Sequence, residues 1–380
     1  MKDILFLFLK LGAFAFGGPA AHIALMQHEV VAKKKWISDE HFLDLVGATS
    51  LIPGPNSTEM AMHCGMERRG FAGLLLAGTA FILPAALITL AFAWMYVQYG
   101  ALPQVAPFFI GLRPAVLALI LSAVYTLGKK ALKSWQLGII GAMVFALNLG
   151  GVSEIVALLI GGIVGVVWFQ MRGQKLLSFF SLGALPVLSS SAESLPVLAQ
   201  LPPSLWQLSL FFLKIGSVLF GSGYVLIAYL EGEMVQRFHW LTQTQLLDAV
   251  AIGQFTPGPV LTTATFIGFQ LQGFWGAILS TICIFLPSFF FVLALNPFIP
   301  KLRKSKLASR FLDAVNISAI SLMLVACVGI VKTSLWGNPV QMLIAAVATF
   351  LLLGWKKLHP IWIIVFSSLG GAFWHFFFAA

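Results

Sequence analysis

A proline-glycine-proline triplet interrupts a long apolar stretch of this sequence and recurs 204 residues later. The first triplet, Pro53–Pro55, lies inside a run from Asp39 to Met66 that is otherwise compatible with a helix, and the second is Pro257–Pro259. Proline lacks an amide donor and its ring excludes the preceding helical turn, so a helix must break at each triplet. In a membrane, such a break is tolerated only where the backbone is buried in protein or lines a cavity.

The composition indicates a membrane protein. Of the 380 residues, 59% are hydrophobic and 9% are charged, with a mean hydropathy of +0.95, whereas soluble domains are about 25% charged. A span needs about 20 apolar residues, so the length accommodates about ten. The net charge of +10 would suit nucleic acid, but the basic residues form short clusters between apolar runs, which is typical of topology signals. We predict an all-α polytopic membrane protein embedded in lipid, with no nucleic-acid partner.

The triplets belong to an internal repeat. Residues 8–58 align without a gap with residues 212–262, and after one deletion residues 65–84 align with 268–287. General apolarity does not explain the matches, because they include charged residues and tryptophan at fixed spacing. Among them are Lys10 with Lys214, Glu29 with Glu233, Trp36 with Trp240, and Asp44 with Asp248. The sequence predicts two homologous halves, residues 1–175 and 204–380, joined by a linker at 176–203.

Each half is predicted to contain the same elements. A first helix breaks at Phe16–Pro19 or Phe220–Gly223, an interrupted helix pair surrounds the triplet, and four long apolar helices follow. The long helices are expected at 71–98, 103–127, 134–150 and 153–171, and at 274–298, 308–331, 338–354 and 359–378. If the first helix spans and the pair at the triplet is re-entrant, each half has five spans, both termini lie outside and the linker lies inside.

The basic loops change sides between the halves. Half one has basic clusters at 33–35, 68–69, 129–133 and 172–175, which fit one side of a membrane. In half two, the turn at 270–272 has no basic residue, whereas the turn at 301–306 is basic and its counterpart at 98–103 is not. Because basic loops stay cytoplasmic, the halves are predicted to be inverted, as in secondary transporters.

The breaks are candidate anion sites. A helix that restarts inside a cavity presents free amides and about half a positive charge at its N-terminus. The candidate substrate contacts there are Gly17, Gly18, Gly54, Gly221 and Gly258, with Asn56, Thr58 and Thr262. Half one is the more polar, because Asn56 and Ser57 correspond to Val260 and Leu261.

Three cations are further candidates for substrate binding. Lys10 and Lys214 lie in apolar helices two turns before the first break, where lysine is expensive and usually functional; the alternative is snorkelling to the surface. Arg113 corresponds to Asn316, and we include both as candidate contacts. Arg113 would supply a counter-charge for an anion, or it is a charge at a helix end.

The repeated carboxylates leave two interpretations open. Glu29, Glu233, Asp44 and Asp248 could carry protons, since burial favours their neutral form, or could be structural partners of Lys10 and Lys214. Glu59 and Asp313 have no counterpart in the other half. The histidines show no compact metal-ligand spacing, the three cysteines indicate neither a disulfide framework nor a thiolate site, and no nucleophile motif or cofactor fingerprint appears. We therefore expect no metal, no cofactor and no enzymatic activity.

Several motifs occur together in half one. They are Phe-Gly-Gly-Pro at 16–19 with Ala-His-Ile at 21–23, the triplet with Asn-Ser-Thr at 56–58, Phe-Ile-Leu-Pro at 81–84, and Gly-Leu-Arg-Pro-Ala-Val at 111–116. In this combination the chain resembles the chromate ion transporter (CHR) family. The resemblance covers both halves, and the length is similar to that of long-chain members with two homologous domains of opposite orientation. Half two departs mildly, with Phe-Gly-Ser-Gly at 220–223.

The resemblance implies export of chromate across the bacterial cytoplasmic membrane, driven by the proton-motive force and conferring chromate resistance. Chromate is a tetrahedral dianion like sulfate, which agrees with an anion site. We expect alternating access around a site between the inverted halves. Sulfate or another oxyanion as substrate, an anion channel, and a membrane protein without transport activity are the alternatives. The sequence leaves open whether the chain forms a homodimer.

Overall fold

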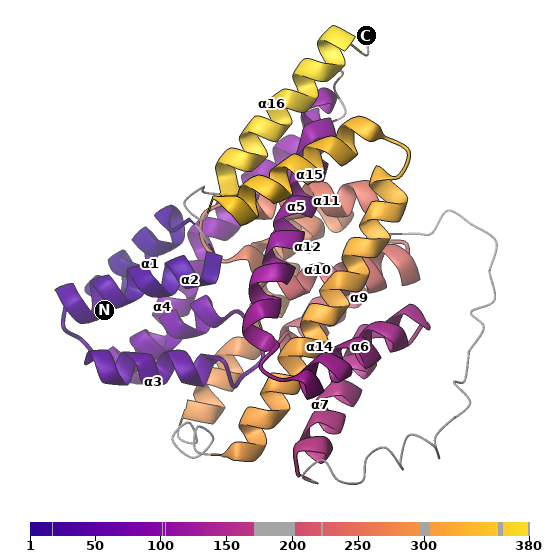
Figure 1. The fold of residues 1–380 in the computed structure, drawn as a ribbon. Helices are drawn as coiled ribbons and strands as arrows, with labels where there is room; N and C mark the ends of the chain where they lie inside the picture. The colour runs from indigo at the N-terminus through magenta and orange to yellow at the C-terminus, as the bar shows by residue number, and fades with distance from the viewer. Residues whose placement is uncertain are drawn as a thin grey trace.

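A computed structural model describes residues 1–16, 18–100, 102, 104–170, 202–221, 223–296, 305–355 and 360–378. The regular elements in these ranges are all helical (Figure 1), as predicted. Half one contains α1 (Lys2–Phe14), α2 (Gly18–Met26) with a π-helical extension (Gln27–Lys33), α3 (Asp39–Thr49), α4 (Asn56–Tyr99), α5 (Ala106–Ala131), α6 (Trp135–Leu149) and α7 (Glu154–Gln170). Nearly all of the predicted linker, together with Gly17 and residues 301–304, lies outside the described residues.

Half two repeats this order. It contains α9 (Leu205–Val218), a 3-10 turn (Gly223–Val225), α10 (Leu226–Tyr229), a π-helical segment (Leu230–Arg237), α11 (Gln243–Phe255), a 3-10 turn (Val260–Thr262), α12 (Thr263–Leu295), α14 (Lys306–Ile330) with a π-helical end (Val331–Leu335), α15 (Pro339–Gly354) and α16 (Pro360–Phe378). The predicted ends of α6, α7, α15 and α16 agree with these bounds to within one residue.

The helices break at the predicted proline and glycine motifs. In half one, α1 ends at Phe14 and α2 begins at Gly18, and the first triplet separates Thr49 from Asn56. Gly18 has a φ of +78° and Gly54 of +141°, a backbone region that favours glycine. The corresponding helix ends in half two are Val218 and Gly223, and Phe255 and Val260.

Both α4 and α12 are helical hairpins. Gly70 interrupts α4 with φ 60° and ψ −148°, and a Cβ atom added to Gly65 would lie 2.2 Å from the carbonyl oxygen of Gly73. Eight residues along a straight helix would separate these positions by about 12 Å, so the arms must fold back on each other. In α12, Gly273 makes the same turn and Gly268 meets Gly276. The predicted helices 71–98 and 274–298 correspond to the long arms of these hairpins, which end at Tyr99 and Leu295.

The helices have the length and surface of a membrane protein. Within the described residues, α4, α5, α12, α14 with its π-helical end, and α16 are long and apolar enough to cross a bilayer, and α6, α7, α9 and α15 are shorter apolar helices. Large apolar side chains such as Phe14, Trp135, Phe350 and Phe377 are exposed. A surface of this kind suits contact with lipid rather than water.

The two halves exchange packing partners. In each half the first helix packs on the hairpin, α1 on α4 and α9 on α12, and the two hairpins contact each other. Beyond them, α5 packs against α15 and α16, whereas its counterpart α14 packs against α6 and α7 (Figure 1). Small residues allow these approaches, because Gly111 meets Ser367 and Gly371, and Gly165 meets Ala314.

Candidate functional site

The triplets join the two halves through reciprocal hydrogen bonds. The amide of Gly54 donates to the carbonyl of Leu219 over 2.7 Å, and the amide of Gly258 donates to the carbonyl of Ala15 over 2.9 Å. Ala15 and Leu219 are corresponding positions at the ends of α1 and α9 in the sequence repeat. The break at each triplet is therefore held against the first-helix break of the other half.

These bonds limit which amides a ligand can reach. The amides of Gly54 and Gly258 are engaged between the halves in this conformation. At the start of α4, the amides of Thr58 and Glu59 bond to the Pro55 carbonyl at 2.8 and 3.1 Å. Among the described residues, the amides of Asn56 and Ser57 at the start of α4 make no main-chain hydrogen bond and are the helix-end donors at this break.

A cavity of about 440 Å³ lies beside the first triplet. Three of the predicted substrate contacts, Asn56, Gly221 and Asn316, line it. They come from the start of α4, the first break of half two, and α14. The structure thus brings together residues that are distant in the sequence and belong to both halves.

Two lysines that sequence reasoning did not assign to the site also line this cavity. Lys133 forms an ion pair with Asp313, with 2.6 Å between Nζ and Oδ1. Lys130 is exposed and has no ion-pair partner in the part of the chain that the structure describes. The sequence interpreted both lysines only as a topology signal. The charge of Lys130 makes the cavity suitable for an anion.

The corresponding region of the other half is almost filled. Gln254 and Val260, which align with Ser50 and Asn56 of the large cavity, line a space of only about 20 Å³ together with Gly18 and Gly258. This volume has room for about one water molecule. The two triplet regions are therefore alike in sequence, but only the first adjoins a cavity large enough for a ligand.

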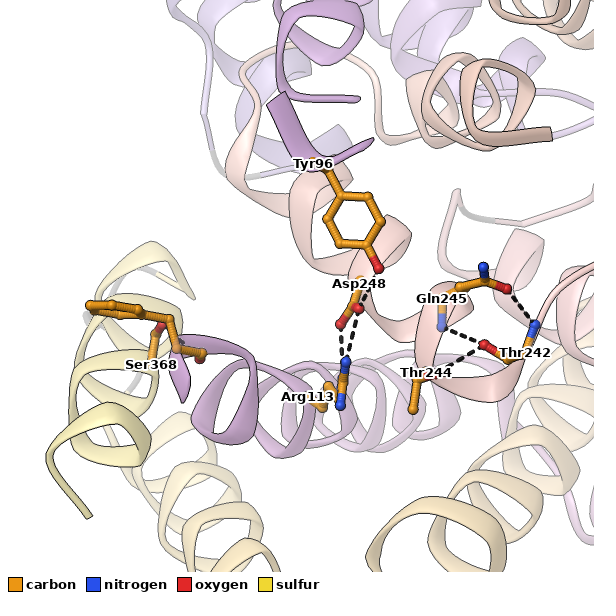
Figure 2. Close-up of polar contacts among 8 residues, drawn as sticks. Tyr96, Arg113, Thr242, Thr244, Gln245, Asp248 and Ser368 are labelled. Carbon is orange, nitrogen blue, oxygen red and sulfur yellow. Dashed lines mark hydrogen bonds and ion pairs between the residues drawn. The ribbon is translucent and has the colours of Figure 1, made fainter. Parts of the chain in front are cut away.

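Arg113 is held by a buried carboxylate of the other half. Its Nε lies 2.9 Å from Oδ1 of Asp248 and its second guanidinium nitrogen 3.1 Å from Oδ2, while the Tyr96 hydroxyl donates to Oδ2 at 2.8 Å (Figure 2). The side chain of Asp248 is only 1% exposed. We call Arg113, Asp248 and Tyr96 the Arg113 clamp. It links α4 and α5 of half one to α11 of half two.

The N-terminus of helix α11 is fixed by a capping box. Thr242 and Gln245 form a capping box, in which the amide of Thr242 donates to Gln245 and the amide of Gln245 donates to Thr242 (Figure 2). Such a box fixes the first turn of a helix. Asp248 lies one turn further along, and the cap thus helps to direct it toward Arg113.

The repeated lysines are paired with the repeated glutamates. Lys10 donates to Glu29 at 3.2 Å, and Lys214 donates to Oε1 of Glu233 at 2.6 Å and also contacts Oε2. None of these four residues lines the large cavity. The contacts agree with the interpretation of these glutamates as structural partners.

The environment of Glu29 favours its charged form. Burial opposes ionisation, but the hydrogen bonds and charges of Lys10 and Lys33 together lower the pKa of its carboxyl below the ordinary value. The fourth repeated carboxylate, Asp44, is half-buried on α3 and does not line the cavity.

Threonines near the two triplets are buried in different ways. The Thr58 side chain is fully buried and its hydroxyl has no hydrogen-bond partner among the described residues. The Thr262 hydroxyl donates to the Pro259 carbonyl at 2.9 Å and lies 3.2 Å from the Thr89 hydroxyl. Thr89 is on the long arm of α4, so this contact also links the halves. No cluster of three potential metal ligands occurs in the described ranges.

An all-helical apolar chain with interrupted helices around a polar cavity defines a multi-pass membrane protein. The family described as chromate transporter matches residues 2–166 and again residues 206–372. The chain therefore belongs to the chromate transporter family, as the motifs indicated.

Curated relatives match over nearly the full length. The chain is 33% identical over 383 residues to a probable chromate transport protein of Synechococcus elongatus, covering 98% of this chain and 96% of the relative. It is 33% identical over 377 residues to the chromate transport protein of Cupriavidus metallidurans, with 98% and 92% covered. For the chromate transport protein of Pseudomonas aeruginosa the identity is 30% over 375 residues, with 96% and 90% covered. No solved structure matches the chain.

Proposed function

We propose that this protein is a secondary transporter that carries chromate, or a related tetrahedral oxyanion, by alternating access between two inverted halves. The observation that carries the proposal is the pair of corresponding regions at the triplets, one open as a cavity of about 440 Å³ and one almost filled at about 20 Å³. A repeat in which one copy is open and the other closed is what alternating access requires.

The large cavity is the proposed oxyanion site in this conformation. Asn56 contributes its side-chain amide and its main-chain amide at the start of α4, while Lys130 supplies a positive charge that no ion pair among the described residues offsets. Asp313, the acidic residue in the lining, is neutralised by Lys133. Amide donors and lysine charge suit an anion that has oxygen acceptors on all sides.

The Arg113 clamp is proposed to keep the second side closed. Removing one partner from a buried ion pair costs about 3–5 kcal/mol, because the remaining charge is buried without compensation. A dianion that moves through a potential of about 100 mV contributes roughly 4–5 kcal/mol. The membrane potential therefore supplies energy of the same order as the clamp, and opening of this side is feasible during transport.

The lysines in the cavity suggest its orientation. Lys130 and Lys133 belong to a cluster that the positive-inside rule assigns to the cytoplasm. We propose that this conformation is open to the cytoplasm, which suits capture and export of the oxyanion through a bacterial cytoplasmic membrane. Resistance to chromate and coupling to the proton-motive force are parts of the same proposal.

The second candidate function is an anion channel. A channel needs a continuous path, and the nearly filled region at Gln254 and Val260 favours a carrier instead. Sulfate remains an alternative substrate, because its shape and charge match those of chromate. The family is a transporter family, and we propose no enzymatic activity for this chain.

Counterflow in proteoliposomes tests the proposal. The purified protein is reconstituted with unlabelled chromate or sulfate inside, and uptake of the labelled anion is followed. A carrier should show saturation and trans-stimulation, and the anion that competes best identifies the substrate. Linear uptake without trans-stimulation would indicate a channel, and no uptake of either anion would contradict oxyanion transport.

Asn56→Ala tests the assignment of the site. Loss of a hydrogen bond to a charged ligand costs about 1.5–3 kcal/mol, so the apparent affinity for the oxyanion should fall by roughly 10–100-fold. The control is Gln98→Ala, which removes an exposed amide side chain near the other end of α4. Equal affinities of the two variants would defeat the assignment.

A further inference from the structure

Glu59 is a fully buried carboxyl that lies beside the first triplet. Its side chain is 0% exposed, and neither carboxyl oxygen has a partner within hydrogen-bond geometry among the described residues. A Cβ atom added to Gly54 would lie 2.1 Å from Oε1 of Glu59 and 2.3 Å from the Ser288 hydroxyl. The carboxyl thus lies directly against the backbone of the break, one turn after Asn56.

Glu59 is the buried end of a stripe of titratable residues on α4. Glu59, His63 and Glu67 are spaced four residues apart, which places them on one face of the helix with about 5–6 Å between successive Cβ atoms. His63 is 1% exposed and neither ring nitrogen has a hydrogen-bond partner among the described residues. The Glu67 side chain is 34% exposed and lies 3.2 Å from Nε2 of His41, which is 45% exposed. The stripe therefore runs from the surface to the triplet.

The charged and titratable groups around this stripe are occupied elsewhere. On α1, Lys10 is paired with Glu29, and on α11, Asp248 is held by the Arg113 clamp. On α2, His22 bonds to the Ala15 carbonyl at 3.0 Å. From α12 and its end, the neutral Ser288 and Asn296 approach Glu59 and His63, and from α3 His41 reaches Glu67. No described cation pairs with Glu59.

A carboxylate in these surroundings would be costly as an anion. An ionised group buried without a partner has a desolvation cost of tens of kcal/mol in a dry interior by Born solvation, so such a group takes up a proton instead. In this conformation Glu59 is accordingly the neutral acid. A second conformation that exposes the triplet to water would let it ionise.

We propose that Glu59 is the proton-carrying carboxyl of the transporter and that Glu67, His41 and His63 conduct the proton between it and the surface. A proton that enters at His41 or Glu67 passes to one nitrogen of His63, whose other nitrogen gives its proton to the Glu59 carboxylate. The imidazole is neutral before and after, and Glu59 gains one proton. This inference rests on the proposed transport function and names its coupling group.

The position of Glu59 links its proton to the anion. An ionised Glu59 one turn from Asn56 would repel an oxyanion in the large cavity, so the protonated acid and the bound anion favour each other and move in the same direction. Export of a dianion with one proton carries one net negative charge outward, so the membrane potential is the part of the proton-motive force that drives it. The path belongs to one half only, because the aligned residues 263–270 of α12 include no Asp, Glu, His, Lys or Arg. Of the four carboxylates predicted as proton carriers, Glu29, Glu233 and Asp248 are bound to cations.

The test measures protons and chromate in the same vesicles. Purified protein is reconstituted with a pH-sensitive dye inside, the membrane potential is clamped with potassium and valinomycin, and a gradient of labelled chromate is applied at an alkaline pH where chromate is the dianion. The ratio of proton flux to chromate flux is the readout. Wild type should show a chromate-driven proton flux, and Glu59→Gln should bring the ratio close to zero, with a proton flux no greater than that of protein-free liposomes. Glu40→Gln, an exposed change beside His41, should keep the wild-type ratio.

The outcomes separate this inference from the proposed function. If wild type moves no labelled chromate, oxyanion transport itself fails. If it moves chromate without protons, or if Glu59→Gln keeps the wild-type ratio, the proton path is overturned. Should Glu59→Gln not reconstitute as a folded protein, His63→Gln decides, because it should also lower the ratio. An unchanged ratio in that variant would overturn the path as well.

Discussion

Two lysine-glutamate pairs occupy corresponding positions of the two halves but differ in burial. The Lys10 side chain is 61% exposed and that of Glu29 is 12% exposed, whereas the values for Lys214 and Glu233 are 42% and 2%. An exposed pair contributes about 0.2–1 kcal/mol. A buried carboxylate that loses its partner costs about 3–5 kcal/mol. The same lysine-glutamate pattern therefore contributes different amounts to the free energy of unfolding in the two halves.

Lys214→Met should lower the apparent Tm in detergent much more than Lys10→Met, because it leaves the carboxylate of Glu233 buried and unpaired. The double variant Lys214→Met with Glu233→Gln should recover part of the loss. The experiment is done at neutral pH, where the Lys10–Glu29 pair is fully formed, so that the Tm shift of Lys10→Met reports the whole contribution of this pair. The pKa of Glu29 is lowered, so its pair is present above the ordinary pKa and lost only as pH falls through the lowered value. Equal shifts for the two lysine variants would contradict this account.

For single residues, the sequence indicated which side chains matter better than it indicated which partners they contact. The spacing of Lys10 and Glu29 is the same as that of Lys214 and Glu233, and a structural pairing was one of the two interpretations it allowed. The partner of Arg113 was not predictable, because Asp248 lies in the other half and no local pattern connects them. For the same reason, Lys130 and Lys133 gave only a topology signal until the fold placed them beside Asn56.

The hairpins α4 and α12 are the elements that present the triplets to the cavities. Their close turns depend on glycines without side chains at facing positions, Gly65 with Gly73 and Gly268 with Gly276. The helix breaks were predictable from the sequence, because the effect of proline and glycine on the backbone is local. That the two arms of each hairpin pack against each other was not predictable, because no periodic sequence pattern connects the residues that make the contact.

Gly65→Ala should destabilise the protein, because its Cβ atom would lie 2.2 Å from a backbone oxygen that cannot move alone. Overpacking of this kind costs about 1–3 kcal/mol. Gly370→Ala on α16 is the matched control, since a Cβ there meets nothing within 4 Å, and alanine favours a helix interior by about 0.5–1 kcal/mol over glycine. The apparent Tm should fall for the first variant and hold or rise for the second. A fall of similar size in both would argue against the hairpin contact.

At the scale of the whole molecule, the halves are interlocked. Helix α5 packs with α15 and α16 of the other half, α14 packs with α6 and α7, and the triplets exchange hydrogen bonds across the same boundary. A movement that opens one triplet region must therefore act on the other. The repeat was visible in the sequence, whereas this exchange of partners was not, because matching positions do not show which copy of a helix each one contacts.

The central claim is that corresponding positions of the two halves open to opposite sides of the membrane. Its most direct test is cysteine accessibility at Ser50, which lines the large cavity, and Gln254, which lines the small one. The native cysteines, Cys64, Cys283 and Cys327, are first replaced, and a membrane-impermeant thiol reagent is applied to right-side-out and everted vesicles, with and without chromate. The account predicts that Ser50→Cys is labelled from the cytoplasmic side and Gln254→Cys only from the opposite side, with chromate shifting the two in opposite directions. Labelling of both positions from the same side would contradict it.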